Sequence, residues 1–302
     1  MNASATHWNR WGQHLAIAGA YAACYELARY VSFSHWILTA GLRLACLLLL
    51  PVRYWPALIL GETLPLIENA VLCAPRFGTP WAISASVPMV VLCMAWVKPL
   101  LRHRPLFNRN GQLRMGVLLA ATLGCSLITA ASTSLTMLAA LLESPGKWPD
   151  MSVPAYFWIF VLGAYLGALT VTPTVLALHE RIRRAPGANI ETLWHSPLFR
   201  DFVLVALPLL AGLAWIATTT QDETIRQVAR MAMMLPIVFV GWRHGWHGSA
   251  IVGMAASVAL AATGSALRDP DMIRSQVVLA LLISGALLVG ARSYRAAHHL
   301  TA

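Results

Sequence analysis

The chain has 302 residues, of which 58% are hydrophobic and only 11% are charged. Soluble domains carry about 25% charged residues, so this composition excludes a water-soluble globular protein. The formal net charge of +10 does not indicate a nucleic-acid-binding protein, because the basic residues lie in short loops between apolar runs rather than on one arm or patch. We therefore predict an integral membrane protein that binds the lipid bilayer and no nucleic acid.

Apolar segments of membrane-spanning length follow one another along the chain. A helix needs about 20 mostly apolar residues to cross the hydrocarbon. By this measure we predict ten segments, at residues 13–33, 36–50, 55–74, 80–101, 114–141, 154–179, 202–219, 228–242, 247–266 and 274–292. If the eighth and ninth segments form one re-entrant hairpin, the number of spanning segments falls to eight. The predicted fold is an all-α polytopic membrane helix bundle with 8–10 transmembrane segments.

The distribution of charge predicts the orientation of this bundle. Most of the 22 Lys and Arg fall in loops that share one side of the membrane if the N-terminus is cytoplasmic. Cytoplasmic loops carry an excess of basic residues, so both ends of the chain are predicted to lie in the cytoplasm. We predict one integral-membrane domain over residues 1–302, embedded at about 13–292. Residues 293–302 are expected to leave the bilayer toward an output domain outside this chain.

Five ionisable side chains fall inside the first three predicted segments: Glu26, Arg29, Arg43, Glu62 and Glu68. Charges at membrane depth are costly unless they pair or face a wet cavity. Glu26 and Arg29 are three residues apart and can therefore pair on one helix face. Arg43 lies at a depth where it can meet Glu62 or Glu68. On a straight helix Glu62 and Glu68 face different directions, although Pro65 between them could change that relation. We interpret all five as a ligand-binding polar pocket; the alternative is a set of ion pairs that fix helix register.

No catalytic or metal-binding pattern accompanies these charges. The sequence has no Walker loop, no HExxH and no GxSxG, and its five cysteines lie singly in apolar segments. His244 and His247 have no third ligand nearby in the sequence and are interpreted as part of an interfacial turn. Trp81 and Trp148 are interpreted as interfacial residues as well. We predict no enzymatic activity in this domain, no metal and no cofactor.

Three stretches of the sequence, in this order, resemble the membrane-associated sensor 1 domain family. The first is LRLACLLLLPVRYWPALILGETLP, an apolar helix followed by RYWP and LG. The second is FWIFVLGAYLGALTVTPTVLAL, and the third is MLPIVFVGWRHGWHGSAIVG. The positions that carry this resemblance are Arg53, Tyr54, Trp55, Pro56, Gly61, Pro173, Arg243 and Gly245. The form with Glu62 and RHGW is most similar to members attached to sensor histidine kinases.

The resemblance implies a multi-pass input module of the bacterial inner membrane that precedes a histidine kinase, a diguanylate cyclase or a cyclic-di-GMP phosphodiesterase. We expect it to form a homodimer and to bind a small-molecule or lipid-like ligand in the intramembrane polar pocket. Binding is expected to relay a conformational change to a cytoplasmic output domain, either fused or separate. The alternative is a secondary transporter or a partner-coupled membrane subunit that uses the same buried charges.

Overall fold

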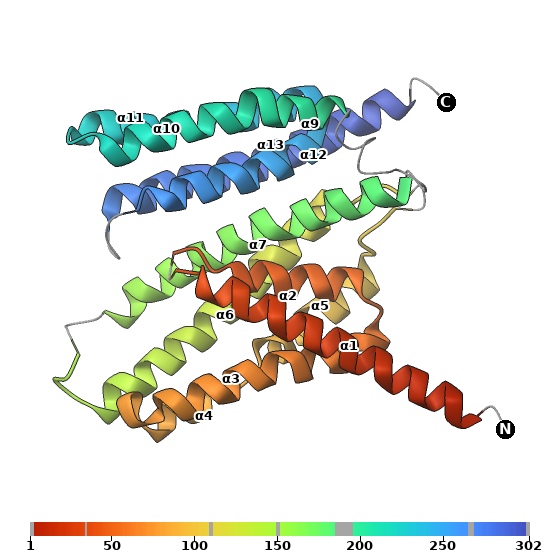
Figure 1. Ribbon diagram of the computed structural model, residues 1–302, viewed down its shortest axis with the longest axis vertical. Coiled ribbons are helices and arrows are strands. Elements are labelled where there is room, and N and C mark those ends of the chain that lie inside the picture. Colours follow the sequence, from red (N-terminus) through yellow and green to blue (C-terminus); the bar gives the residue numbers. More distant parts are fainter. Residues whose placement is uncertain are drawn as a thin grey trace. The chain divides into compact units, whose positions relative to one another are not determined.

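The computed structural model describes residues 3–33, 35–108, 111–148, 152–184, 196–264 and 269–299 (Figure 1). Seven helical stretches are long and apolar enough to cross a membrane: Val52–Phe77, Thr79–His103, Met115–Glu143, Val153–Arg183, Pro197–Thr219, Glu223–Ala262 and Pro270–Arg292. A shorter apolar helix covers Leu38–Leu49. The described residues contain no β-strand. The prediction of an all-α polytopic membrane bundle is therefore confirmed, with seven spanning stretches in the described residues where 8–10 segments were predicted. The side on which the two ends lie stays a prediction.

The helices follow the predicted segments in chain order. They are α1 (Ala3–Tyr30), α2 (Leu38–Leu49), η1 (Val52–Tyr54), α3 (Trp55–Phe77), α4 (Thr79–Ala85), α5 (Met89–His103), α6 (Met115–Glu143), α7 (Val153–Arg184), α9 (Pro197–Asp201), the π-helical η2 (Phe202–Ala206), α10 (Leu207–Thr219), α11 (Glu223–Ala232), α12 (Leu235–Ala262) and α13 (Pro270–His299). Helix α1 has 28 residues but is not one of the seven spans, because polar side chains such as Gln13 and His14 lower its hydropathy.

The chain divides into two compact units. The first comprises Met1–Arg104 and Ala120–Ala168, and the second comprises Pro105–Leu119 and Leu169–Ala302. In the first unit α1 packs along α3, and α2 packs against α1 and α5 (Figure 1). In the second unit α12 packs along α13, and α10 packs against α11 and α12. Helices α6 and α7 each contribute residues to both units, and the prediction of a single membrane domain stays a prediction.

The stretch WRHGWHG reverses the chain inside α12. Gly245 has φ 65° and ψ −151°, a backbone conformation that is essentially restricted to glycine. A Cβ atom on Gly248 would lie 2.5 Å from the carbonyl oxygen of Val240. In a straight helix these two residues would be about 12 Å apart. The predicted eighth and ninth segments are therefore the two arms of a hairpin that turns at this glycine.

The core of the first unit consists of small, aliphatic and aromatic side chains from α1, α2, α3, α5, α6 and α7. Its fully buried members include Leu44, Leu58, Val90, Val97 and Ala164. Side chains in such a core interdigitate at the density of an organic crystal, and this brings the helix backbones close together. A charged pair lies within this core, and its geometry is the starting point for the functional site.

Candidate functional site

Arg43 on α2 and Glu62 on α3 form an ion pair inside the first unit. Arg43 is 2% exposed and Glu62 is 0% exposed. The Arg43 Nη2 atom donates to Glu62 Oε1 at 2.9 Å, and Arg43 Nε donates to Oε1 and Oε2 at 3.2 and 3.1 Å. A guanidinium that engages both carboxylate oxygens gives a strong and geometrically specific contact. Of the two carboxylates that the sequence placed within reach of Arg43, the structure pairs it with Glu62.

Three further groups complete the hydrogen bonding of this pair. The Tyr21 hydroxyl on α1 donates to Glu62 Oε2 at 2.9 Å, and the Val90 N–H in the first turn of α5 donates to Glu62 Oε1 at 3.3 Å. Arg43 Nη1 donates to the Thr129 hydroxyl on α6 at 3.5 Å. A buried ion pair is tolerated when its remaining hydrogen-bonding groups are satisfied, as they are here. The cluster therefore joins α1, α2, α3, α5 and α6 at one point.

The other three predicted site residues lie outside this cluster. Glu68 is exposed on α3 and makes no ion pair or hydrogen bond with any residue that the structure describes. Its six-residue separation from Glu62 turns it about 240° around the helix, and Pro65, which α3 accommodates, does not bring it back. Glu68 therefore lies apart from the Arg43–Glu62 pair, and its predicted role in ligand binding stays a prediction.

Glu26 and Arg29 do pair with each other, as their spacing predicted. The Arg29 Nη2 atom lies 2.8 Å from Glu26 Oε2, and the two side chains are 42% and 40% exposed, respectively. Within the residues that the structure describes, Glu26 and Arg29 hydrogen-bond to each other and not to Arg43 or Glu62. They form a separate surface pair near the end of α1, so the five predicted residues do not make a single pocket.

The first group of family-motif residues shapes the entry into α3. Arg53 lies in the turn that precedes the helix, and Pro56 occupies the first helical turn, where its missing N–H costs nothing. Trp55 is buried and donates from Nε1 to the Leu50 carbonyl at 3.2 Å. Gly61 is buried further along the same helix. The remaining motif residues, Pro173, Arg243 and Gly245, belong to the second unit.

A second group of charged side chains surrounds the turn in α12. Asp201 is buried; its Oδ2 atom lies 2.7 Å from His244 Nε2 and 3.1 Å from Arg243 Nη1. His247 Nε2 lies 3.4 Å from an oxygen of Glu180 on α7. Sequence reasoning placed the two histidines in a turn but missed both carboxylates, which are distant in the chain. One feature of the sequence could have linked them: the distribution of Lys and Arg predicts that the two histidines and the two carboxylates lie on the same side of the membrane.

No metal site emerges from this group within the part of the chain that the structure describes. Nowhere in those residues do three or more His, Cys, Asp or Glu side chains come close enough together to hold an ion. The acidic and basic side chains around the α12 turn instead bond to one another. They can therefore anchor the turn to α7 and to the start of the α9–α10 segment.

The backbone of the turn packs directly on α13. A Cβ atom on Gly290 would lie 2.5 Å from the Trp246 nitrogen and 2.8 Å from the Gly245 carbonyl carbon, closer than side-chain carbons come in proteins. A residue without a side chain is therefore needed for the helix and the turn to lie this near each other. Any movement of the ion-paired turn must be accommodated by α13.

A further ion pair, between Arg230 on α11 and Asp269, holds the start of α13. Asp269 Oδ1 accepts from the N–H groups of Asp271 and Met272 at 3.0 and 3.1 Å, and Oδ2 accepts from the buried Arg230 at 2.9 Å. Partial burial alone would raise the pKa of the Asp269 carboxyl. The hydrogen bonds from Met272 and Arg230 outweigh that effect and hold its pKa below the ordinary value of 3.8.

These features define a multi-pass membrane protein whose buried charges join helices to one another. The MASE1 family model matches residues 14–296, and the chain belongs to the MASE1 family, the membrane-associated sensor 1 domains. MASE1 is a membrane sensory input domain of signalling proteins and is not catalytic, so the predicted family and the predicted absence of enzymatic activity in this domain are confirmed. No curated protein and no solved structure matches the chain.

Proposed function

We propose that this domain receives a signal in the bacterial inner membrane and passes it, as a change in helix packing, along α13 to a cytoplasmic output domain. The output is a histidine kinase or a cyclic-di-GMP enzyme, of which the RHGW form of the turn favours the kinase. A ligand shifts such an equilibrium only by binding one packing more tightly than the other. Signalling therefore requires a contact at which two helix packings differ and a helix that carries this difference to the cytoplasmic output domain.

The contact between the α12 turn and Gly290 is the observation that supports this proposal. Backbone lies against backbone there, so a small displacement cannot be absorbed by a flexible side chain. Helix α13 continues past Arg292, the last residue of its membrane-spanning stretch, to His299. A displacement at Gly290 would be carried along that continuous helix.

Helix α7 supplies the connection from the first unit to the turn. It begins in the first unit and carries Glu180, the partner of His247, in the second. In our proposal Arg43 and Glu62 do not contact the ligand themselves, because their polar atoms are already engaged with each other and with neighbouring helices. They hold α1, α2, α3, α5 and α6 in one register, so that these helices respond together.

Two glycines on α13 provide a matched test of the relay. Gly290→Ala would place a methyl group against the turn, whereas Gly285→Ala meets nothing within 4 Å. Both changes raise helix propensity equally. In a chimera with a histidine kinase core after α13, we expect Gly290→Ala to change autophosphorylation in membrane vesicles severalfold and Gly285→Ala to leave it unchanged. Equal activity of both folded variants would contradict the relay.

A further inference from the structure

Glu68 lies on a face of α3 that no other described part of the chain covers. It is exposed and follows Trp55 by about 20 Å along the helix, which places it well inside the membrane-spanning stretch Val52–Phe77. The exposed side chains around it are apolar: Leu64 is 57% exposed and Val71 is 67% exposed. A carboxyl group that faces lipid at this depth is costly, and such groups usually have a partner.

Arg29, Arg43 and Arg76, cations on the first three helices, are engaged elsewhere. Arg29 and Arg43 belong to the two ion pairs described above. Arg76 lies about 12 Å beyond Glu68 along α3, and its guanidinium carbon is 5.4 Å from the centroid of the Phe77 ring. None of these three cations pairs with Glu68 in the part of the chain that the structure describes.

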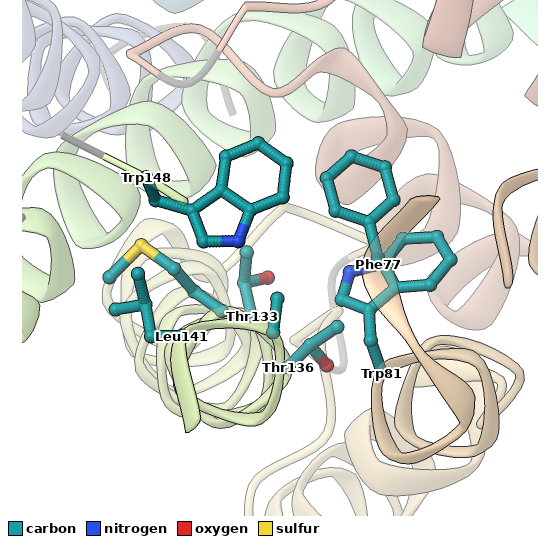
Figure 2. Close-up of a pocket in the computed structure, with 8 residues that line it drawn as sticks. Phe77, Trp81, Thr133, Thr136, Leu141 and Trp148 are labelled. Carbon is teal, nitrogen blue, oxygen red and sulfur yellow. The ribbon is translucent and has the colours of Figure 1, made fainter. Parts of the chain in front are cut away.

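Other sides of α3 are already occupied within the chain. Glu62 and Ala70 are buried there. At the C-terminal end of the helix the Phe77 ring packs against two tryptophans, with its centroid 4.6 Å from that of Trp81 and 5.2 Å from that of Trp148 (Figure 2). These three rings line an apolar cavity of about 360 Å³ that carries no charged side chain. The side of α3 that bears Glu68 is therefore the one open to a further partner.

The exposed side of α3 has the spacing of a helix-pairing seam. Leu64, Glu68, Val71 and Pro75 are exposed and follow one another at intervals of four, three and four residues. Residues at alternating intervals of three and four stay on one face when two helices wrap around each other at a small crossing angle. Exposed apolar side chains flank them: Leu60, Ile67 and Leu72. We call Leu64, Glu68, Val71 and Pro75 the α3 seam.

A second copy of the chain would satisfy Glu68 by symmetry. Two copies inserted in the same direction are related by a two-fold axis along the membrane normal, so each residue of the α3 seam meets its own counterpart at the same depth. The two Glu68 side chains then face each other. A protonated carboxyl group both donates and accepts hydrogen bonds, so two of them satisfy each other without a counter-ion. Hydrogen bonds of this kind between helices stabilise association in lipid.

We propose that this chain forms a parallel homodimer through the α3 seam, with the two Glu68 carboxyl groups hydrogen-bonded to each other across the two-fold axis. A second copy fits better than a basic partner helix, because it needs no cation and because its own apolar seam residues match those next to Glu68. The proposal goes beyond the relay proposed above. It gives Glu68 a protein partner in place of the small ligand that the sequence suggested.

Disulfide crosslinking of the whole chain in phosphatidylcholine–phosphatidylglycerol liposomes locates the interface. The background is Cys24→Ala, because Cys24 is the exposed cysteine. We expect Leu64→Cys and Val71→Cys to form disulfide-linked dimers with copper–phenanthroline at a low protein-to-lipid ratio, since each residue meets its counterpart. The matched control is Leu135→Cys on α6, which is 65% exposed and should not crosslink. Equal crosslinking at the three positions, or none at Leu64 and Val71, would overturn the proposal.

Substitutions of Glu68 test the hydrogen bond itself. Energy transfer between labelled copies in the same liposomes measures the dissociation constant of the dimer. Glu68→Leu should fold, because the position is exposed to lipid, and should weaken the dimer about tenfold, the scale of an interhelical hydrogen bond. Glu68→Gln should stay within about threefold of the unaltered chain, because its amide also donates and accepts.

Three results would refute the hydrogen-bonded dimer: a monomeric unaltered chain, equal dimerisation of Glu68→Leu, or a loss in Glu68→Gln as large as that in Glu68→Leu. The last result would mean that an ionised carboxylate and a cation form the contact. Neither measurement requires the output domain. If the dimer forms as expected while Gly290→Ala leaves kinase activity in the chimera unchanged, the proposed relay fails and the dimer stands.

Discussion

Removing one partner of the Arg43–Glu62 pair should destabilise the first unit strongly. Arg43→Met leaves the Glu62 carboxylate buried, with only the Tyr21 hydroxyl and the Val90 N–H as donors. Breaking a buried ion pair in this way costs about 3–5 kcal/mol, because one charge remains uncompensated. A cost of this size lowers the folded-to-unfolded ratio by a factor of roughly one hundred to several thousand. Glu62→Met should have a comparable effect.

The double variant Arg43→Met/Glu62→Met should recover much of this loss. It removes both charges and fills the space with two unbranched apolar side chains. Tyr21, Val90 and Thr129 then lose their partners, at about 1 kcal/mol for each buried donor that cannot reach another acceptor. We therefore expect the double variant to be destabilised by about 2 kcal/mol, less than either single variant. The two substitutions are then strongly non-additive.

Equilibrium unfolding in mixed micelles with increasing dodecyl sulfate, followed by circular dichroism, measures these differences. Arg29→Met provides the control, because it breaks a half-exposed ion pair and should cost less than about 1 kcal/mol. The reasoning is refuted if Arg43→Met costs no more than Arg29→Met. It is also refuted if the loss in the double variant equals the sum of the losses in the single variants.

Three further changes test other parts of the structure. Glu68→Gln should leave the midpoint of the same unfolding transition within experimental error, because Glu68 is exposed on α3; a large loss would mean that it is buried after all. Gly245→Ala should cost about 1–3 kcal/mol of unfolding free energy, since its backbone conformation is restricted to glycine, and an unchanged midpoint would contradict the hairpin turn. Asp269 has a lowered pKa in the folded state, so its stabilising contribution is present above its ordinary value of 3.8 and disappears as the pH falls through the native pKa. Asp269→Asn should therefore flatten the acid side of a melting-temperature profile, and parallel profiles would argue against the pair with Arg230.

The sequence alone determined the class of protein, most of the helices and the family. Apolar residues in runs of membrane-spanning length leave few structures other than helices, because every backbone polar group must be satisfied without water. The turn at WRHGWHG was predictable for the same local reason, since glycine and polar residues interrupt two apolar arms. The pairing of Glu26 with Arg29 followed from a three-residue spacing. Each of these inferences depends on neighbours within a few turns of one helix.

Contacts between distant segments were decided by the tertiary structure. On a straight helix only one of Glu62 and Glu68 could face Arg43, and the sequence left open whether Pro65 changes that relation. The packing decided for Glu62: Tyr21 on α1 and Val90 on α5 donate to its carboxylate, and Thr129 on α6 accepts from Arg43. Asp201 and Glu180 became partners of the α12 turn in the same way. Trp81 and Trp148, which the sequence predicted at the membrane interface, both pack against Phe77, because the loop after α6 lies on the end of α3. Such contacts depend on how helix faces meet, and a periodicity read along one helix carries no information about which face of another helix lies opposite.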